Sequence, residues 1–256
     1  MLLLLSKDLR QAWRTFRLPA LVLTGVFFAL LEPLTAKFMP EILAYMAKEL
    51  EGLAEILPQM GPLEALTSFC GDLTQIGALV LIAIAMGAVA LERERGIAAW
   101  VLTRPISRSA YFWSKYLALL IGVAVTLIVS GALALAYTAT LFGPFPVGGA
   151  LWGLLFIGIF LMLILAVTVT ASSLLRSQLA AGGVGIAFLF IIFVPQLLLG
   201  GTAVVRYFPH TLAGHLSGLL SGMLEWTYFL PAALITAALA NLLVAAGAFF
   251  FQKAEL

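Results

Sequence analysis

The sequence is short of charged residues. Only 10% of its 256 residues are Asp, Glu, Lys or Arg, whereas 63% are hydrophobic and the mean hydropathy is +1.12. A typical soluble domain carries about 25% charged and about 45–50% apolar residues. This shortage excludes a soluble globular enzyme, a disordered chain and a nucleic-acid-binding protein. It predicts an all-α integral membrane protein that lies in a lipid bilayer.

Cysteine, histidine and lysine are also scarce. A single cysteine, Cys70, excludes an intrachain disulfide, and the two histidines, His210 and His215, have no apparent third ligand, so we expect no metal site. A phosphate-binding P-loop needs a lysine directly after a glycine, and no lysine of this chain follows one. We therefore expect no catalytic residue and no cofactor in this chain, and any ATP hydrolysis must take place in another polypeptide.

Charge-free stretches define the membrane spans. A helix needs about 20 apolar residues to cross the hydrocarbon core, and a charge near its centre is costly. The longest charge-free stretch, from Tyr116 to Leu175, is too long for one span, and its helix-breaking centre Gly143–Gly149 divides it in two. The sequence therefore predicts six transmembrane helices: Leu18–Ala36, Leu73–Leu91, Tyr111–Leu141, Ala150–Ser172, Leu179–Leu199 and Tyr228–Phe251.

Lysine and arginine are distributed unevenly between the connecting segments. Of the 14, only Lys37, Lys48 and Arg206 lie on one side of the predicted spans, and the others lie in the N-terminal segment, the remaining loops and the C-terminal end. Because short cytoplasmic segments carry the excess of Lys and Arg, both termini are predicted to be cytoplasmic. We expect a multi-pass protein of the cell membrane.

Two segments outside the spans have patterns of their own. Residues 1–17 are amphipathic and basic, and we expect an interfacial elbow helix on the cytoplasmic leaflet. Residues 37–71 form a long outer loop, in which periodicity predicts one helix over Glu41–Leu57 and a second, short helix over Leu63–Cys70.

Several residues near the outer ends of the spans are candidates for a translocation path or gate. The glycine-rich segment 200–227 predicts two short re-entrant or interfacial helices with a break near Gly218 and Gly222. Glu32, which precedes a proline, suits either an outer vestibule or the outer headgroup level. Gln75 suits either the path or a hydrogen bond between helices.

The cytoplasmic segment 92–110 is the most informative part of the sequence. Charged residues and turn formers bracket a short apolar stretch, Ile97–Leu102, that contains Trp100: Glu92, Arg93, Glu94, Arg95 and Gly96 precede it, and Arg104, Pro105, Ser107 and Arg108 follow it. Ser107 suits the N-cap of the third span. A short helix with charged ends suits docking into a groove of a cytoplasmic protein. The alternative is an ordinary cytoplasmic loop without a docking role. Such a loop is expected to carry the arginines but not the acidic residues.

The stretch Glu92–Lys115 resembles the permease subunits of ATP-binding-cassette (ABC) exporters of the second type. It shares their pattern of Glu-x-Glu-x-Gly, a short apolar helix, Thr-x-Pro-x-Ser-Arg and an aromatic-rich helix. The tight loop at Ser172–Ser177, the six spans and the length extend the resemblance to residues 1–256 as a single permease domain. The resemblance implies a homodimer that works with two ATPase subunits holding ATP and magnesium. It also implies that segment 92–110 docks on the ATPase, with Arg176 in the next inner loop beside it.

Two other functions remain open at this level. An ion-coupled secondary transporter tends to show internal repeats and ionisable groups within its spans, and neither is evident here. A non-transporting scaffold or mechanotransmission subunit of an ABC complex would share the whole pattern of the exporter permease. A sealed interface between two protomers would favour this second alternative.

Overall fold

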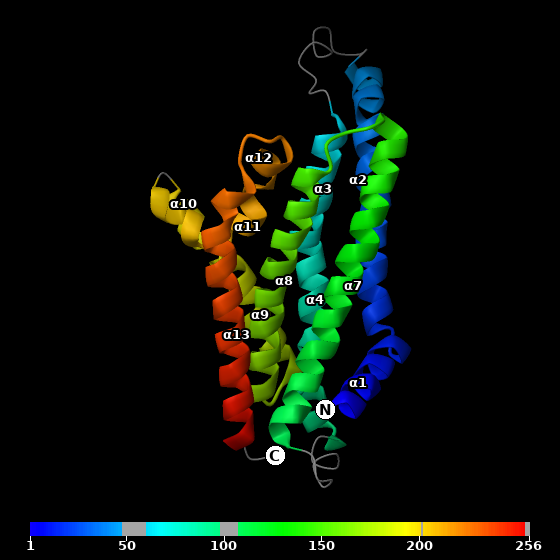
Figure 1. The fold of residues 1–256 in the computed structure, drawn as a ribbon. Coiled ribbons are helices and arrows are strands. Elements are labelled where there is room, and N and C mark those ends of the chain that lie inside the picture. The colour runs from blue at the N-terminus through cyan, green and yellow to red at the C-terminus, as the bar shows by residue number, and fades with distance from the viewer. Residues whose placement is uncertain (48–59, 98–106, 201, 254–256) are drawn as a thin grey trace.

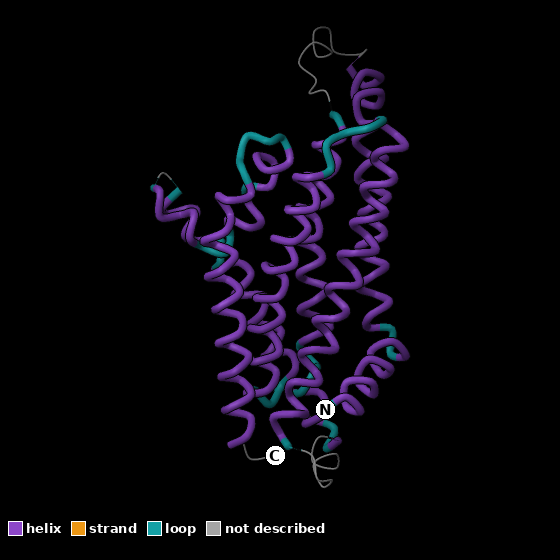
Figure 2. Tube along the Cα trace, in the orientation of Figure 1, coloured by secondary structure: helices purple, strands orange, loops and turns teal. Residues whose placement is uncertain are grey.

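The computed structural model describes residues 1–47, 60–97, 107–200 and 202–253 (Figure 1). Within these ranges the chain consists of helices and connecting loops, without strands (Figure 2). Six helical segments are long and apolar enough to cross a membrane: Arg17–Met39, Pro62–Glu94, Arg108–Phe142, Gly148–Leu174, Gln178–Leu199 and Trp226–Lys253. The prediction of an all-α protein with six spans is confirmed.

Both ends of the chain lie at one end of the bundle (Figure 1). Helix α1 (Leu2–Arg14) lies obliquely there, and α13 (Leu230–Lys253) ends there. We call this the terminal end and the opposite one the distal end. The distribution of Lys and Arg predicts that the terminal end faces the cytoplasm.

Helix α8 (Gly148–Leu174) lies at the centre of the bundle. It contacts α4 (Ala78–Ala85), α7 (Arg108–Phe142), α9 (Gln178–Ile191) and α13, while α2 (Arg17–Ala47) packs along α7. A helix that is apolar on all sides favours burial on all sides. α8 is apolar on all sides. Ile157, Leu163 and Ile164 are fully buried, whereas Leu151 and Leu155 in its distal half are exposed.

The first two spans are longer than predicted. α2 continues to Ala47, so residues 41–47 belong to it, and the prediction that they begin a separate outer helix is wrong; the rest of the predicted helix, residues 48–57, lies outside the described residues. α3 (Pro62–Asp72) continues through a π-helical turn, Leu73–Gly77, into α4, so the predicted second loop helix is also part of a span. Charge limits a helix only inside the hydrocarbon core, so Glu41 and Glu64 in these extensions do not end the helices.

The fifth span is bent rather than straight. α9 ends at Ile191, and α10 (Val194–Leu199) points away from the bundle after a turn (Figure 1). Pro195 lies in the first turn of α10. Backbone N–H groups of a first turn have no partner within the helix, so proline loses no hydrogen bond there and favours the start of a new helix. The 14 residues of α9 extend about 21 Å, less than the roughly 30 Å of the hydrocarbon core.

Short helices cover the distal end between α10 and α13. We call residues 203–229 the distal cap, which contains η3 (Ala203–Tyr207), α11 (Thr211–Gly214), α12 (Leu216–Leu220) and η4 (Trp226–Phe229). The chain turns at Gly222, whose φ of +76° favours glycine, whereas Gly218 lies within α12 beneath Leu224. α11 and α12 pack against α8, and α12 also contacts α3.

Candidate functional site

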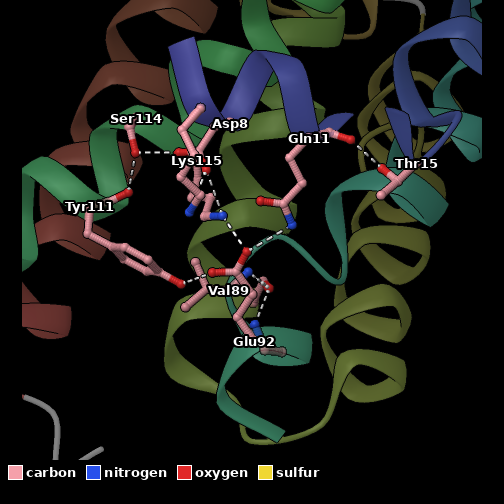
Figure 3. Close-up of polar contacts among 11 residues, drawn as sticks. Asp8, Gln11, Thr15, Val89, Glu92, Tyr111, Ser114 and Lys115 are labelled. Carbon is pink, nitrogen blue, oxygen red and sulfur yellow. Dashed lines mark hydrogen bonds and ion pairs between the residues drawn. The ribbon is translucent and has the colours of Figure 1, made fainter. Parts of the chain in front are cut away.

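A cluster of buried polar side chains joins three helices at the terminal end (Figure 3). We call it the elbow cluster: Asp8 and Gln11 from α1, Glu92 from α5 (Ala90–Glu94), and Tyr111, Ser114 and Lys115 from α7. Its three charged side chains are almost fully enclosed, because Asp8, Glu92 and Lys115 are only 5%, 6% and 7% exposed. Burial of this kind is costly unless every charge is paired.

Lys115 pairs with both carboxylates of the elbow cluster. Its Nζ lies 2.9 Å from Asp8 Oδ1 and 2.5 Å from Glu92 Oε1. Ser114 Oγ donates to the second oxygen of Asp8 at 2.6 Å. The Tyr111 hydroxyl donates to the second oxygen of Glu92, and Gln11 Nε2 donates to the first at 3.3 Å. Both oxygens of each buried carboxylate are therefore hydrogen-bonded.

The elbow cluster ties both ends of segment 92–110 to α1. α5 ends at Glu94, just before the undescribed residues 98–106, and α7 begins just after them, at Arg108. Glu92 and Lys115 therefore hold the two flanks of this segment together, and Asp8 adds the N-terminal helix. A displacement of either flank must move α1 or break a buried ion pair.

The second span bends sharply just before the elbow cluster. α4 ends at Ala85 and α5 starts at Ala90, which leaves backbone groups without helical partners. Ser172 Oγ on α8 accepts hydrogen bonds from the N–H groups of Val89 (3.1 Å) and Ala90 (3.0 Å), and it donates to the carbonyl of Met86 at 2.7 Å. The Ser172 hydroxyl therefore supplies hydrogen-bond partners for three backbone groups at the bend. Polar side chains of neighbouring helices have the same role at other bends in membrane helices.

Replacing Ser172 by alanine is expected to lower the free energy of unfolding by about 1–3 kcal/mol, because buried backbone groups lose their partner. Ser173→Ala is the matched control, since the Ser173 hydroxyl donates to the Thr170 carbonyl of its own helix. Thermal unfolding of both variants in detergent measures the difference. Equal midpoints for the two variants would contradict the role of Ser172.

Three further residues that were predicted to contact a partner form hydrogen bonds within the bundle. Arg93 donates to the Ser173 carbonyl at 2.9 Å, and Glu94 accepts from the backbone N–H of Gln178 at the start of α9, also at 2.9 Å. Arg108 donates to the Gln252 carbonyl at 3.2 Å. These contacts link the flanks of the segment to α8, α9 and α13.

Five of the predicted partner-facing residues are exposed at the terminal end: Glu94, Arg95, Gly96, Ser107 and Arg176. Ile97, the first residue of the apolar stretch, is exposed as well. Ser107 accepts a hydrogen bond from the Ala110 N–H and caps α7 as predicted. Trp100, Arg104 and Pro105 lie outside the described residues.

The structure separates the four candidate gate residues into two places. Glu32 on α2 is half-buried and faces Asp72, and Gln75 is exposed in the adjacent π-helical turn. Gly218 and Gly222 lie in the distal cap. The π-helical turn places an exposed amide within a membrane span, an arrangement that often accompanies function.

A buried histidine anchors the distal cap. His210 is 1% exposed, and its Nε2 lies 3.0 Å from Gln196 Oε1, while its Nδ1 has no hydrogen-bond partner among the described residues. Burial, together with neighbouring His215, lowers the pKa of His210 below its ordinary value. Among the described residues no three His, Cys, Asp or Glu side chains are grouped to hold a metal ion.

The protein is expected to lose stability in mild acid through His210. The unfolded chain takes up a proton below about pH 6.5, whereas the folded chain resists protonation until a lower pH. The free energy of unfolding should therefore fall as the pH drops below about 6.5. Midpoints measured between about pH 5 and 7.5 should decline less steeply in His210→Gln, and parallel slopes would exclude His210 as the cause.

The sequence pattern does not single out most of the elbow cluster. Asp8 belongs to the amphipathic segment 1–17, and Tyr111 and Lys115 belong to the stretch Glu92–Lys115. Two signals were present: Asp8 is the only acidic residue before Glu32, and Lys115 is the last charge before the long apolar stretch. Neither signal reveals that these two residues form an ion pair.

Six spans, with charged residues on both flanks of the segment between the second and third, define a multi-pass membrane protein. The chain belongs to the ABC-2 family of transporter proteins, whose model matches residues 2–256. Membership of this family identifies it as a permease of the ABC-2 type.

A curated relative supports the same assignment to a membrane protein. The chain is 30% identical over 117 residues to the uncharacterized transmembrane protein YxlG of Bacillus subtilis (strain 168). The match covers 46% of this chain and 45% of that protein, so it spans less than half the length of the relative.

Proposed function

We propose that this chain is the membrane subunit of an ATP-driven exporter. Two copies form a homodimer, and each copy docks one separate ATPase subunit that binds ATP and magnesium at the cytoplasmic, terminal end. Closure of the ATPases then drives a substrate across the membrane. The observation that carries this proposal is the elbow cluster, which ties both flanks of segment 92–110 to α1.

The contacts around the segment supply a route for movement into the spans. A push on the accessible residues Arg95 and Ile97 acts on α5, which is held to α7 and α1 through Glu92 and Lys115. Glu94 connects the same segment to the start of α9. A motor outside the membrane can therefore tilt α9 and α7 relative to central α8. The same route serves a mechanotransmission subunit that moves no substrate.

Charge reversal at the proposed docking surface tests this function. The chain is co-expressed with a candidate ABC ATPase subunit, and Arg95→Glu is compared with the matched reversal Arg206→Glu at the distal end. Like charges across an interface cost several kcal/mol, so Arg95→Glu should weaken ATPase binding at least about tenfold and abolish the stimulation of ATP hydrolysis. Arg206→Glu should leave both unchanged.

Two outcomes decide against the proposal or refine it. Normal ATPase binding and stimulation in Arg95→Glu, at normal membrane expression, would show that this surface does not dock the motor. Coupled hydrolysis without uptake of any added compound into inverted vesicles would favour the mechanotransmission subunit over the exporter.

A further inference from the structure

The N-terminal helix presents a basic face that the rest of the bundle leaves uncovered. Lys7, Arg10 and Arg14 of α1 are exposed, and their spacing places them within about 60° of one another around the helix. Lys7 Nζ lies 3.4 Å from Asp8 Oδ1, an oxygen that Lys115 also binds, at 2.9 Å. Arg10 and Arg14 have no ion-pair or hydrogen-bond partner among the described residues, so both guanidinium groups can bind a ligand.

Folding removes the acidic side chain of α1 from this face. Asp8 is the only acidic residue of α1, and it is buried where it points from the helix toward Lys115 (Figure 3). The exposed surface of α1 therefore carries three cations and no anion. A surface with this excess of one charge attracts negatively charged ligands.

An apolar face lies beside the basic face on the same helix. Leu2 and Trp13 are 81% and 64% exposed, and Leu9, which is partly exposed, lies in line with them. At 3.6 residues per turn this apolar face is centred about 110° from the basic face. Adjacent apolar and basic faces are typical of a helix that lies in the plane of the membrane interface, where tryptophan is enriched at the level of the headgroups.

The connection to the first span places α1 at the surface of the bilayer. α1 ends at Arg14 and the first span begins at Arg17, so only two residues separate them. α1 packs against α7 and α2 and lies obliquely at the edge of the terminal end (Figure 1). In the connecting turn, the Phe16 side chain is 60% exposed outside the bundle. The uncovered faces of α1 are therefore at the depth where lipid headgroups surround the bundle.

We infer that the basic face of α1 binds the headgroup of an anionic phospholipid in the leaflet at the terminal end. A hollow of about 550 Å³ runs along this face, and its lining includes all three cations and the hydroxyl of Ser6. Guanidinium groups donate paired, charge-assisted hydrogen bonds to phosphate oxygens. The adjacent apolar face contacts the upper part of the acyl chains. The site is independent of whether the protein exports a substrate.

The charge of the headgroup sets the selectivity of this site. Phosphatidylglycerol has a net negative charge, whereas the choline cation of phosphatidylcholine cancels the charge of its phosphate. An acidic surface of a cytoplasmic protein would also complement the three cations. The apolar face favours lipid, because a water-soluble partner would have to displace lipid from Leu2 and Trp13 at the level where the first span begins.

Lipid binding to the full chain tests the inference. The protein is purified in a mild non-ionic detergent, and bound lipids are counted by native mass spectrometry while phosphatidylglycerol or phosphatidylcholine with identical acyl chains is added. The unmodified chain should bind phosphatidylglycerol at least about tenfold more tightly than phosphatidylcholine. In the double variant Arg10→Gln, Arg14→Gln this preference should fall at least about fivefold, because each cation near an anionic headgroup contributes to binding.

A second double variant supplies the matched control. Arg95→Gln, Arg176→Gln removes the same charge from two exposed residues at the same end of the bundle. Its preference for phosphatidylglycerol should stay within about twofold of that of the unmodified chain. Both double variants should keep the unfolding midpoint, since all four arginines are exposed.

Two results would overturn the inference. An equal loss of preference in the two double variants would show that phosphatidylglycerol responds to the net charge of the terminal end and not to α1. Unchanged preference in Arg10→Gln, Arg14→Gln, together with lost binding of the ATPase subunit, would show that the basic face docks a protein instead of a lipid.

Discussion

Replacing Lys115 by methionine is expected to release α1 from the bundle and to lower the free energy of unfolding by about 3–5 kcal/mol. The substitution keeps the apolar stem of the side chain but removes the buried cation between Asp8 and Glu92. Glu92 loses its ion pair, and Asp8 keeps the exposed Lys7, whose Nζ lies 3.4 Å from its Oδ1. Their hydrogen bonds from Ser114 and Gln11 remain and do not replace the lost charge. Thermal unfolding in detergent and proteolysis near the turn at Thr15 measure the two effects.

Two comparisons separate the ion pairs from a general effect of losing a lysine. Lys253→Met, at the exposed end of α13, should change the unfolding midpoint little. The triple variant Asp8→Asn, Glu92→Gln, Lys115→Met replaces all three charges by neutral groups and should recover much of the stability, because the unpaired charges are gone. If Lys115→Met is as stable as Lys253→Met, the elbow cluster does not hold α1.

The elbow cluster also predicts a functional defect for Lys115→Met. The flanks of segment 92–110 would no longer be tied to each other, so a push on α5 would not reach α1 and α7. In membranes where the variant still inserts, the ATPase should still bind, but stimulation of hydrolysis should be lost. Arg95→Glu is expected to lose binding itself, so the two variants distinguish docking from transmission.

Replacing Gly149 by leucine is expected to displace the distal cap from α8. Even a Cβ atom at this position would lie 2.7 Å from the Leu219 carbonyl oxygen and 3.2 Å from the Leu220 Cα. Both are backbone atoms of α12, so no side-chain rotation relieves the clash and the helix itself must move. Overpacking of this kind costs about 1–3 kcal/mol, and we expect the upper end of this range or more. Hydrogen exchange over residues 211–222 measures the displacement.

Gly148 provides the control for Gly149. A Cβ atom there would meet nothing within 4 Å, although the two glycines are adjacent in the first turn of α8. Gly148→Ala should leave the protein unchanged or stabilise it by up to about 1 kcal/mol, because alanine restricts the unfolded chain. Similar exchange in Gly149→Leu and Gly148→Ala would contradict the close contact between α8 and α12.

The distribution of charge predicted the number of spans but not their distal ends. Charged residues at the terminal end, such as Glu92 and Arg176, coincide with the helix limits, because ionised groups there cannot enter the hydrocarbon core. At the distal end, Glu41 and Glu64 do not limit the helices, which run on past the region where the bilayer penalises charge. The bend before α10 was not predicted for a related reason. Hydropathy shows how long an apolar segment is, but it does not show the direction in which the helix runs.

Segment 92–110 was recognised from its sequence, and its anchoring was not. Alternating charges, an apolar stretch and a capping serine are local features that can be read along the chain. The partners of those charges are remote, since Lys115 meets Asp8 across 107 residues and Arg108 meets Gln252 across 144. Sequence spacing contains no information about such pairs.

By itself the sequence determined that this protein crosses a membrane six times, because ionised side chains are too costly in hydrocarbon and their positions divide the chain. Only the tertiary structure decided which of the remaining charges are buried and paired. The docking of α1 beside α5 and α7 turned Asp8, Glu92 and Lys115 from surface charges into an internal ion-pair cluster. Burial depends on what packs over a residue, and that contact is made by helices far apart in the chain.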